Sequence, residues 1–185
     1  MNTNTATLAR NTSTGYVEVT VGPTPHELMR KAVGAVSSAP LRAFLADFIN
    51  QDEIDAILSS DNSRPGAPLR RYTVQILRSA AETAAHAEAY GPAERDALYV
   101  ATFVEGCRPY LKSTLEPGAT LDDVFYTLVH EGLRRLDRRD ERMASLVRMC
   151  LDLGLPDEVD DFYVPRLRQG VLRALKRAHT VSSYL

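Results

Sequence analysis

The residues of this 185-residue chain that could do chemistry are its four histidines, its two cysteines and one carboxylate inside an apolar stretch. That stretch is YVATFVEGCRPYL, residues 99–111, and it places Glu105 and Cys107 among apolar side chains. A buried carboxylate has a raised pKa unless it meets an arginine or a hydroxyl, and such shifted groups are frequent in active sites. Glu105 is therefore a catalytic candidate, a partner of Arg108 or Arg71 in an ion pair, or a side chain exposed near a helix end.

The other reactive side chains do not form a familiar catalytic or metal-binding pattern. Cys107 has no histidine near it in the sequence, which argues against a Cys-His nucleophile. His130 and Glu131 are adjacent, so on a helix they point about 100° apart, and they lack the second histidine of an HExxH site. Cys107 and Cys150 form no C-x-x-C motif and fit structural thiols in a reducing compartment. We predict no bound metal and no cofactor.

Composition places the chain among ordinary globular proteins. With 44% apolar and 25% charged residues, it is long enough for one sizeable core. Its formal net charge of −2 does not produce the positive field typical of non-specific nucleic-acid binding, so nucleic acid is an open but not a favoured partner. The sequence has neither an apolar signal segment nor a run approaching the roughly 18 apolar residues of a membrane span. We expect a cytoplasmic protein that neither spans nor binds a membrane.

A polar tail and a short extended segment precede the helical part of the chain. Residues 1–14 are rich in Asn and Thr and poor in apolar side chains, which predicts a flexible polar tail. Residues 15–22, GYVEVTVG, alternate apolar and polar side chains, which predicts a short strand or an extended arm. No second strand is evident, so we expect this segment to pair with a partner or to lie along the helices.

Residues 23–185 are predicted to form one helical domain, so that the fold class is an all-α, single-domain helical bundle. Capping residues, prolines and helical periodicity indicate the helices. We expect them at about 25–36, 40–49, 52–60, 69–89, 93–107, 121–137 and 140–153, and from about 165 onwards. The predicted core residues are Leu98, Phe103, Phe125, Leu128, Leu146 and Leu167.

Two of these helices have informative faces. The helix at 93–107 is apolar nearly all round, which predicts the central buried helix. In the helix at 69–89, one face, which we expect to be buried, consists of Val74, Leu77, Ala81, Ala84, Ala85 and Glu88. The opposite face, which we expect to be exposed, consists of Gln75, Glu82 and His86.

Two charged segments could contact a partner. The run RRLDRRDER, residues 134–142, alternates acids with arginines, which is typical of a solvated, salt-bridged helix face. The last helix differs, because it has no acid after residue 162 and its basic side chains surround an apolar stripe. These are Arg166, Arg168, Arg173, Lys176 and Arg177. They predict a surface for an anionic partner. Basic residues near the C-terminal end of a helix can also stabilise that helix by interacting with its dipole.

Four segments resemble the helical core of the HD-domain superfamily, most of all the HD-like proteins related to relaxases of conjugative elements. They are PLRAFLADFINQDEI, RRYTVQILRSAAETA, GPAERDALYVATFVEGCRPYL and LRRLDRRDERMASLVRMCLDLG, and the resemblance covers residues 38–178. It implies a site in which an early His, a His-Asp pair on the central helix and a later Asp hold metal ions that activate water against a phosphoester. Here Tyr72 stands at the early position and Glu105-Gly106 replaces the His-Asp pair, so the ligand pattern is missing.

Two functions are consistent with these observations, and whether the protein is an enzyme stays open. The first is a non-catalytic interaction or regulatory module on a degenerate HD-like scaffold, encoded by a mobile genetic element, that binds a protein partner or forms a homodimer. Its partner-binding residues would be Tyr16, Val17, Val19, Arg166, Arg168, Arg173 and Arg177. The second is an atypical metal-dependent phosphohydrolase acting on a nucleotide or nucleic acid. Its candidate residues are Glu105, Asp122, His130 and Glu131. We favour the first, because function depends on the site rather than on the fold.

Overall fold

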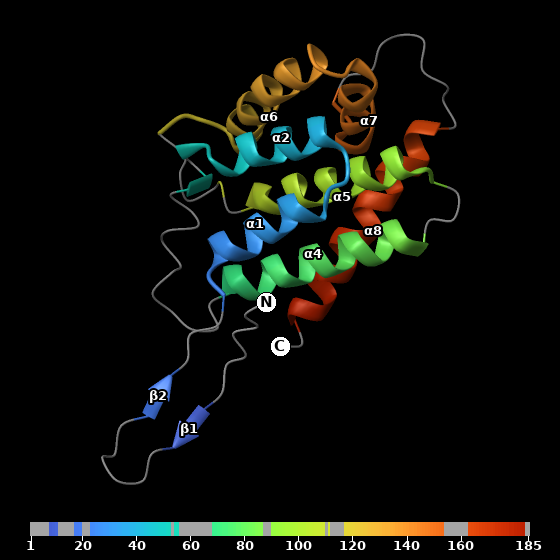
Figure 1. Ribbon diagram of the computed structural model, residues 1–185. Helices are drawn as coiled ribbons and strands as arrows, with labels where there is room; N and C mark the ends of the chain where they lie inside the picture. The colour runs from blue at the N-terminus through green and yellow to red at the C-terminus, as the bar shows by residue number, and fades with distance from the viewer. Residues whose placement is uncertain are drawn as a thin grey trace.

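The protein is a helical bundle preceded by a small hairpin (Figure 1). The structure, a computed structural model, describes residues 8–10, 17–19, 23–52, 54–55, 68–86, 90–109, 111, 117–153 and 163–183. Within these residues there are seven α-helices, which confirms the predicted all-α fold. The helices are α1 (Pro25–Ala35), α2 (Ala39–Ile49), α4 (Pro68–His86), α5 (Pro92–Cys107), α6 (Leu121–Asp137), α7 (Glu141–Leu151) and α8 (Tyr163–Ser183).

Local capping explains where these helices begin. At α1, the amide of Glu27 donates to Thr24 Oγ1 at 3.2 Å and the amide of Thr24 donates to Glu27 Oε2 at 2.7 Å, which is a complete capping box. Side-chain oxygens of Ser38, Thr120 and Asp140 cap α2, α6 and α7. Each capping side chain bonds to a backbone amide three residues further along, so capping residues mark a helix start locally in the sequence. The predicted helix ends differ from the observed ones by at most three residues. Most of the helix predicted at 52–60 lies outside the described residues.

The central position of α5 organises the bundle. Every residue from Ala97 to Val104 is buried, and α5 contacts α2, α4, α7 and α8. In Figure 1, α6 and α7 lie above α5 and α4 lies below it. The hydroxyl of Thr102 in this stretch is satisfied, since Thr102 Oγ1 donates to the carbonyl of Leu98 at 2.8 Å. All six predicted core residues are buried, which confirms that prediction.

Three buried glycines lie at helix crossings where no side chain fits. A Cβ atom at each would come within 3.0 Å of a side chain on the neighbouring helix. The pairs are Gly106 with Ile76 of α4, Gly132 with Phe44 of α2, and Gly170 with Leu98 of α5. The missing side chains therefore allow α4, α5 and α8, and likewise α2 and α6, to approach one another closely.

The predicted burial of α4 is only partly correct: Leu77 and Ala84 pack against the core and Glu82 is exposed, as expected, but other residues differ. Val74, Ala81 and Ala85 are exposed, whereas Gln75 is buried. The reason is that α4 packs against α1, α5 and α8 at once, and its close contact with α5 forms through Ile76 at Gly106. Among the residues of α4 whose side chains the structure describes, the buried ones are Thr73, Gln75, Ile76, Ser79 and Ala80. Short polar side chains are accepted at such a contact because their hydroxyls can bond to the backbone of their own helix.

The N-terminal segment forms a hairpin within the chain. Strand β1 (Leu8–Arg10) pairs antiparallel with β2 (Val17–Val19), with Ala9 opposite Glu18. Two predictions are therefore wrong, because part of the predicted polar tail is a strand and the predicted strand has a mate in the same chain. Figure 1 shows the hairpin extending away from the helices, and no described helix forms an extended contact with it. Each strand of a two-stranded ladder still has one unpaired edge.

The close approach of α2 and α6 predicts that Gly132→Ala destabilises the protein. The new Cβ would lie 2.8 Å from Phe44 Cε2, and moving a rigid ring in a packed core should lower the free energy of unfolding by about 1–3 kcal/mol. Gly34→Ala is the matched control, because Gly34 is an exposed helical glycine whose Cβ would meet nothing within 4 Å. That variant should be more stable by up to about 1 kcal/mol. Urea unfolding measures both, and a Gly132→Ala variant as stable as the parent would contradict the close packing.

Candidate functional site

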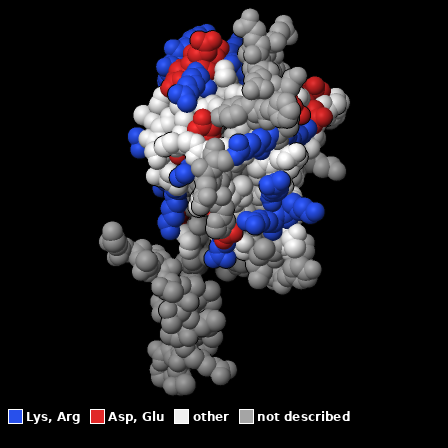
Figure 2. Space-filling view, turned by 90° about the vertical axis from the view of Figure 1, so that its right-hand side faces the viewer, with Lys and Arg blue, Asp and Glu red and all other residues white. Residues whose placement is uncertain are grey.

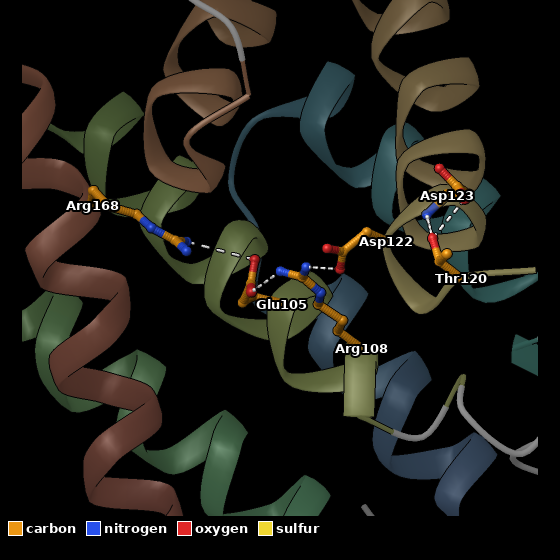
Figure 3. Close-up of polar contacts among 6 residues, drawn as sticks. All are labelled: Glu105, Arg108, Thr120, Asp122, Asp123 and Arg168. Atoms are coloured by element: carbon orange, nitrogen blue, oxygen red, sulfur yellow. Dashed lines mark hydrogen bonds and ion pairs between the residues drawn. The ribbon is translucent and has the colours of Figure 1, made fainter.

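Four charged side chains meet where α5, α6 and α8 come together (Figure 3). We call them the Glu105 cluster: Glu105, Arg108, Asp122 and Arg168. Glu105 lies in the last turn of α5, and Arg108 follows directly as the C-cap of that helix. Asp122 lies in the first turn of α6, and Arg168 comes from α8. The cluster thus joins three helices that are separated in the sequence.

Two arginines hold the carboxylate of Glu105. Arg108 Nη1 donates to Oε1 at 3.0 Å, and Arg168 Nη1 lies 3.6 Å from Oε2. The same nitrogen of Arg168 donates to the carbonyl of Cys150 at 3.2 Å, which fixes this side chain against α7. The side chain of Glu105 is only 10% exposed, and its Oε2 accepts no hydrogen bond. The ion pair with Arg108 was one of the predicted alternatives and is confirmed, whereas the side chain of Arg71 lies outside the described residues.

Arg108 links Glu105 to Asp122. Its Nη2 donates to Asp122 Oδ1, and its guanidinium lies 5.0 Å above the ring centre of Phe125, where the negative face of the ring favours a cation. The hydrogen bond to Asp122, and after it the bond to Glu105, raise the pKa of Arg108 above its ordinary value against the effect of burial. Arg108 is therefore a permanent cation between two carboxylates.

The cluster is balanced in charge. Two guanidiniums face two carboxylates, so a divalent ion held by Glu105 and Asp122 would have to displace the guanidinium of Arg108. The next acid, Asp123, is bound to Thr120 at the start of α6, where Thr120 Oγ1 donates to Asp123 Oδ2 at 2.6 Å (Figure 3). In the part of the chain that the structure describes, no three His, Cys, Asp or Glu side chains are arranged to hold a metal.

The remaining candidates for a phosphohydrolase site do not join the cluster. His130 and Glu131 are exposed on α6, about 12 Å along the helix axis from Asp122. Glu131 lies 3.7 Å from Arg134 on the same helix. The structure therefore brings together Glu105 and Asp122 but not the other two predicted residues.

Gly106 has a packing role at the position where the resembled family carries the Asp of its His-Asp pair. Its Cβ would lie 2.5 Å from Ile76 Cδ1, so a ligand side chain there would push α4 away from α5. The side chain of Tyr72, at the other predicted ligand position, lies outside the described residues.

Burial keeps both thiols protonated. Cys107 and Cys150 are free and buried, and burial raises the pKa of each thiol to about 12. A thiol must ionise before it can act as a nucleophile or bind a metal, so at neutral pH neither group is suited to this chemistry. This supports the prediction that both are structural.

The basic residues of α8 fall into two groups. Arg168 points inward to the Glu105 cluster, and Arg166 stacks over the ring of Tyr90 at 4.9 Å. Tyr90 Oη also donates to the carbonyl of Arg166 at 3.0 Å, a contact that sequence reasoning missed because its two ends are far apart in the chain. Arg173 and Arg177 are exposed, and neither forms an ion pair with another described residue. Of the proposed N-terminal contacts, Val17 and Val19 lie in β2 and Tyr16 lies outside the described residues.

The charged run at 134–142 is a salt-bridged face, as predicted, but its partners lie mostly outside the run. The pairs are Arg134 with Glu131 (3.7 Å), Arg135 with Asp47 of α2 (3.6 Å), and Arg142 with Glu94 of α5 (3.9 Å). Two acids inside the run serve other contacts, because Asp137 binds Arg148 of α7 at 3.1 Å and Asp140 caps α7. Exposed pairs of this kind contribute little stability.

Comparison with family models, curated proteins and solved structures finds no match for this chain. The resemblance to the HD-domain superfamily therefore stays a prediction. Among the described helices, none is long and apolar enough to cross a membrane.

The contacts of Glu105 predict that Glu105→Gln destabilises the protein by about 2 kcal/mol, because Arg108 and Arg168 would keep only a neutral partner. This is below the loss for a fully buried pair, since the two arginines are 29% and 21% exposed. Glu131→Gln removes an exposed carboxylate beside Arg134 and should change stability by less than about 0.5 kcal/mol. Chemical unfolding measures both, and equal losses would mean that the cluster does not hold the helices together.

Proposed function

We propose that this protein is a non-catalytic helical module that binds a protein partner and that its HD-like scaffold has lost the metal-binding pattern. One observation carries the proposal: the guanidinium of Arg108 lies between the carboxylates of Glu105 and Asp122. A catalytic metal ion would need that place, and a fixed cation there both repels an incoming cation and neutralises its ligands. The charged residues at the end of α5 then serve to hold α5, α6 and α8 together.

The partner surface that we propose has two parts. The first is the hairpin, where the outer edge of β2, with Val17 and Val19, offers backbone groups that its described partner β1 does not pair to a strand of a partner or of a second copy. Tyr16, also proposed as a contact, lies outside the described residues. The second is the exposed basic face of α8, with Arg166, Arg173 and Arg177. Arg168 is left out of this surface, because it binds Glu105 and the carbonyl of Cys150. We place the protein in the cytoplasm and, on the resemblance alone, in the setting of a mobile genetic element.

The metal-dependent phosphohydrolase is the alternative, and metal binding separates the two functions. We expect protein incubated with Mn²⁺, Mg²⁺ or Zn²⁺ and then desalted to retain far less than one ion per chain, because Arg108 occupies the space between the carboxylates. Hydrolysis of a chromogenic phosphodiester and of nucleoside monophosphates should equal the buffer blank. About one ion per chain by elemental analysis, with hydrolysis that Glu105→Gln abolishes and Glu131→Gln retains, would establish the phosphohydrolase instead.

The hairpin is expected to contribute to association but not to the stability of the bundle. Removing residues 1–22 should weaken self-association in sedimentation velocity while leaving helicity and the thermal midpoint nearly unchanged, because no described helix forms an extended contact with β1 or β2. Removing only residues 1–7 is the control, since both strands remain.

Two results would contradict this role of the hairpin. Loss of helicity on removing residues 1–22 would make the segment part of the folded core. Unchanged association would place the interface elsewhere on the protein.

A further inference from the structure

We infer that the exposed face of α8 docks a short acidic segment of a partner protein, with an apolar side chain of that segment packed on Leu172. We call this surface the α8 face, and it consists of Leu172, Arg173, Lys176 and Arg177. The inference rests on the proposed function and specifies the chemistry of the partner.

Charge is distributed unevenly between α8 and the rest of the chain. Residues 163–183 contain five of the 22 Lys and Arg residues and no acid, so the remaining residues have 17 basic side chains against 24 acidic ones and a formal charge of −7. Figure 2 shows the side of the molecule on which the upper part of α8 lies in Figure 1. Lys and Arg side chains spread over the middle of this side with little red between them, whereas both charges mix at the top.

The cations of the α8 face are not neutralised within the described protein. Arg173, Lys176 and Arg177 are exposed and form no ion pair with another described residue, unlike Arg134, Arg135 and Arg142 of the charged run. They are spaced three and four residues apart, where like charges repel and destabilise a helix. Such a cluster is stabilised by carboxylates from another molecule.

The helix dipole does not account for these cations. Its stabilising effect on basic residues is confined to the last turn of a helix, and the last turn of α8 has no basic residue. Arg173 and Arg177 lie at least one turn before that end. The dipole explanation that the sequence left open therefore fails for the residues that define the face.

Leu172 adds an exposed apolar side chain at one edge of the face. Its side chain is 49% exposed, and among the described residues only Val74 and Tyr126 are other large apolar side chains with comparable exposure. Lys176 follows it by four residues and lies beside the exposed leucine, whereas Arg173, the next residue, points about 100° away around the helix. Apolar side chains bordered by polar or charged ones are typical of protein interfaces.

A protein segment fits this surface better than a nucleic acid does. A phosphate backbone needs many cations along its path, and around α8 it would meet a remainder of the chain with a formal charge of −7. No aromatic side chain belongs to the α8 face, so it offers no platform on which bases could stack. A compact acidic segment needs only the three cations and Leu172.

Fluorescence anisotropy on the full chain tests the inference with a labelled helical peptide of about 14 residues, in which leucines at every fourth position are flanked by glutamates. We expect Arg173→Gln/Arg177→Gln to weaken binding about tenfold and Leu172→Ser to weaken it about threefold to tenfold. Raising the salt concentration should weaken binding to the parent more than to the double variant. Arg138→Gln/Arg139→Gln is the matched control, because those arginines are also exposed and unpaired among the described residues but lie beside acids, and binding should be unchanged.

The inference is overturned if the peptide does not bind, if the control variant loses as much affinity as the α8 variants, if Leu172→Ser has no effect, or if a labelled DNA duplex binds more tightly than the peptide. Failure of the proposed function has a different signature, namely a stoichiometric metal and phosphoester hydrolysis that depends on Glu105. If the protein neither hydrolyses phosphoesters nor binds the acidic peptide, the proposed non-catalytic function stands and only the proposed role of the α8 face is overturned.

Discussion

The carboxylate of Glu105 cannot be buried without cations, and the arrangement of three helices depends on meeting that need. Burial at the end of α5 removes the carboxylate from water, which is costly unless charged hydrogen-bond donors replace the solvent. Arg108 supplies one donor locally, and Arg168 brings a second cation from α8. The rotation of α8 about its axis is set by its fully buried apolar stripe, Leu167, Val171, Ala174 and Ala178, and Arg168 points inward beside that stripe. The remaining exposed basic residues of α8 then point away from the bundle.

Close packing between α4 and α5 depends on Gly106. Without a side chain there, α4 and α5 approach until Ile76 fills the space, and this contact is part of the core around the central helix. A larger residue at this position would separate the two helices. A metal-ligating side chain at this position, as the predicted resemblance would require, is therefore incompatible with the observed packing.

The two basic segments show why charge in a sequence has to be interpreted together with its surroundings. In the run at 134–142, three arginines find carboxylates on α2, α5 and α6, so their charge is largely neutralised. On α8, the exposed cations find none among the described residues. The first segment is part of the bundle's own surface, and the second is the surface that we propose for a partner.

The sequence by itself determined the helices, because caps, prolines and apolar periodicity act within a few residues. It also determined the burial of α5. The ion pair of Glu105 with Arg108 was among its predicted alternatives, since three positions separate the two residues on one helical turn. Only the tertiary structure decided which face of α4 is buried, since Gln75 and Val74 exchange their expected places once α5 and α8 pack against Ile76. It likewise decided the mate of β2, the contact of Arg168 with Glu105 and the bond of Arg108 to Asp122, because these join residues whose distance in space is set by the whole fold and not by the residues between them.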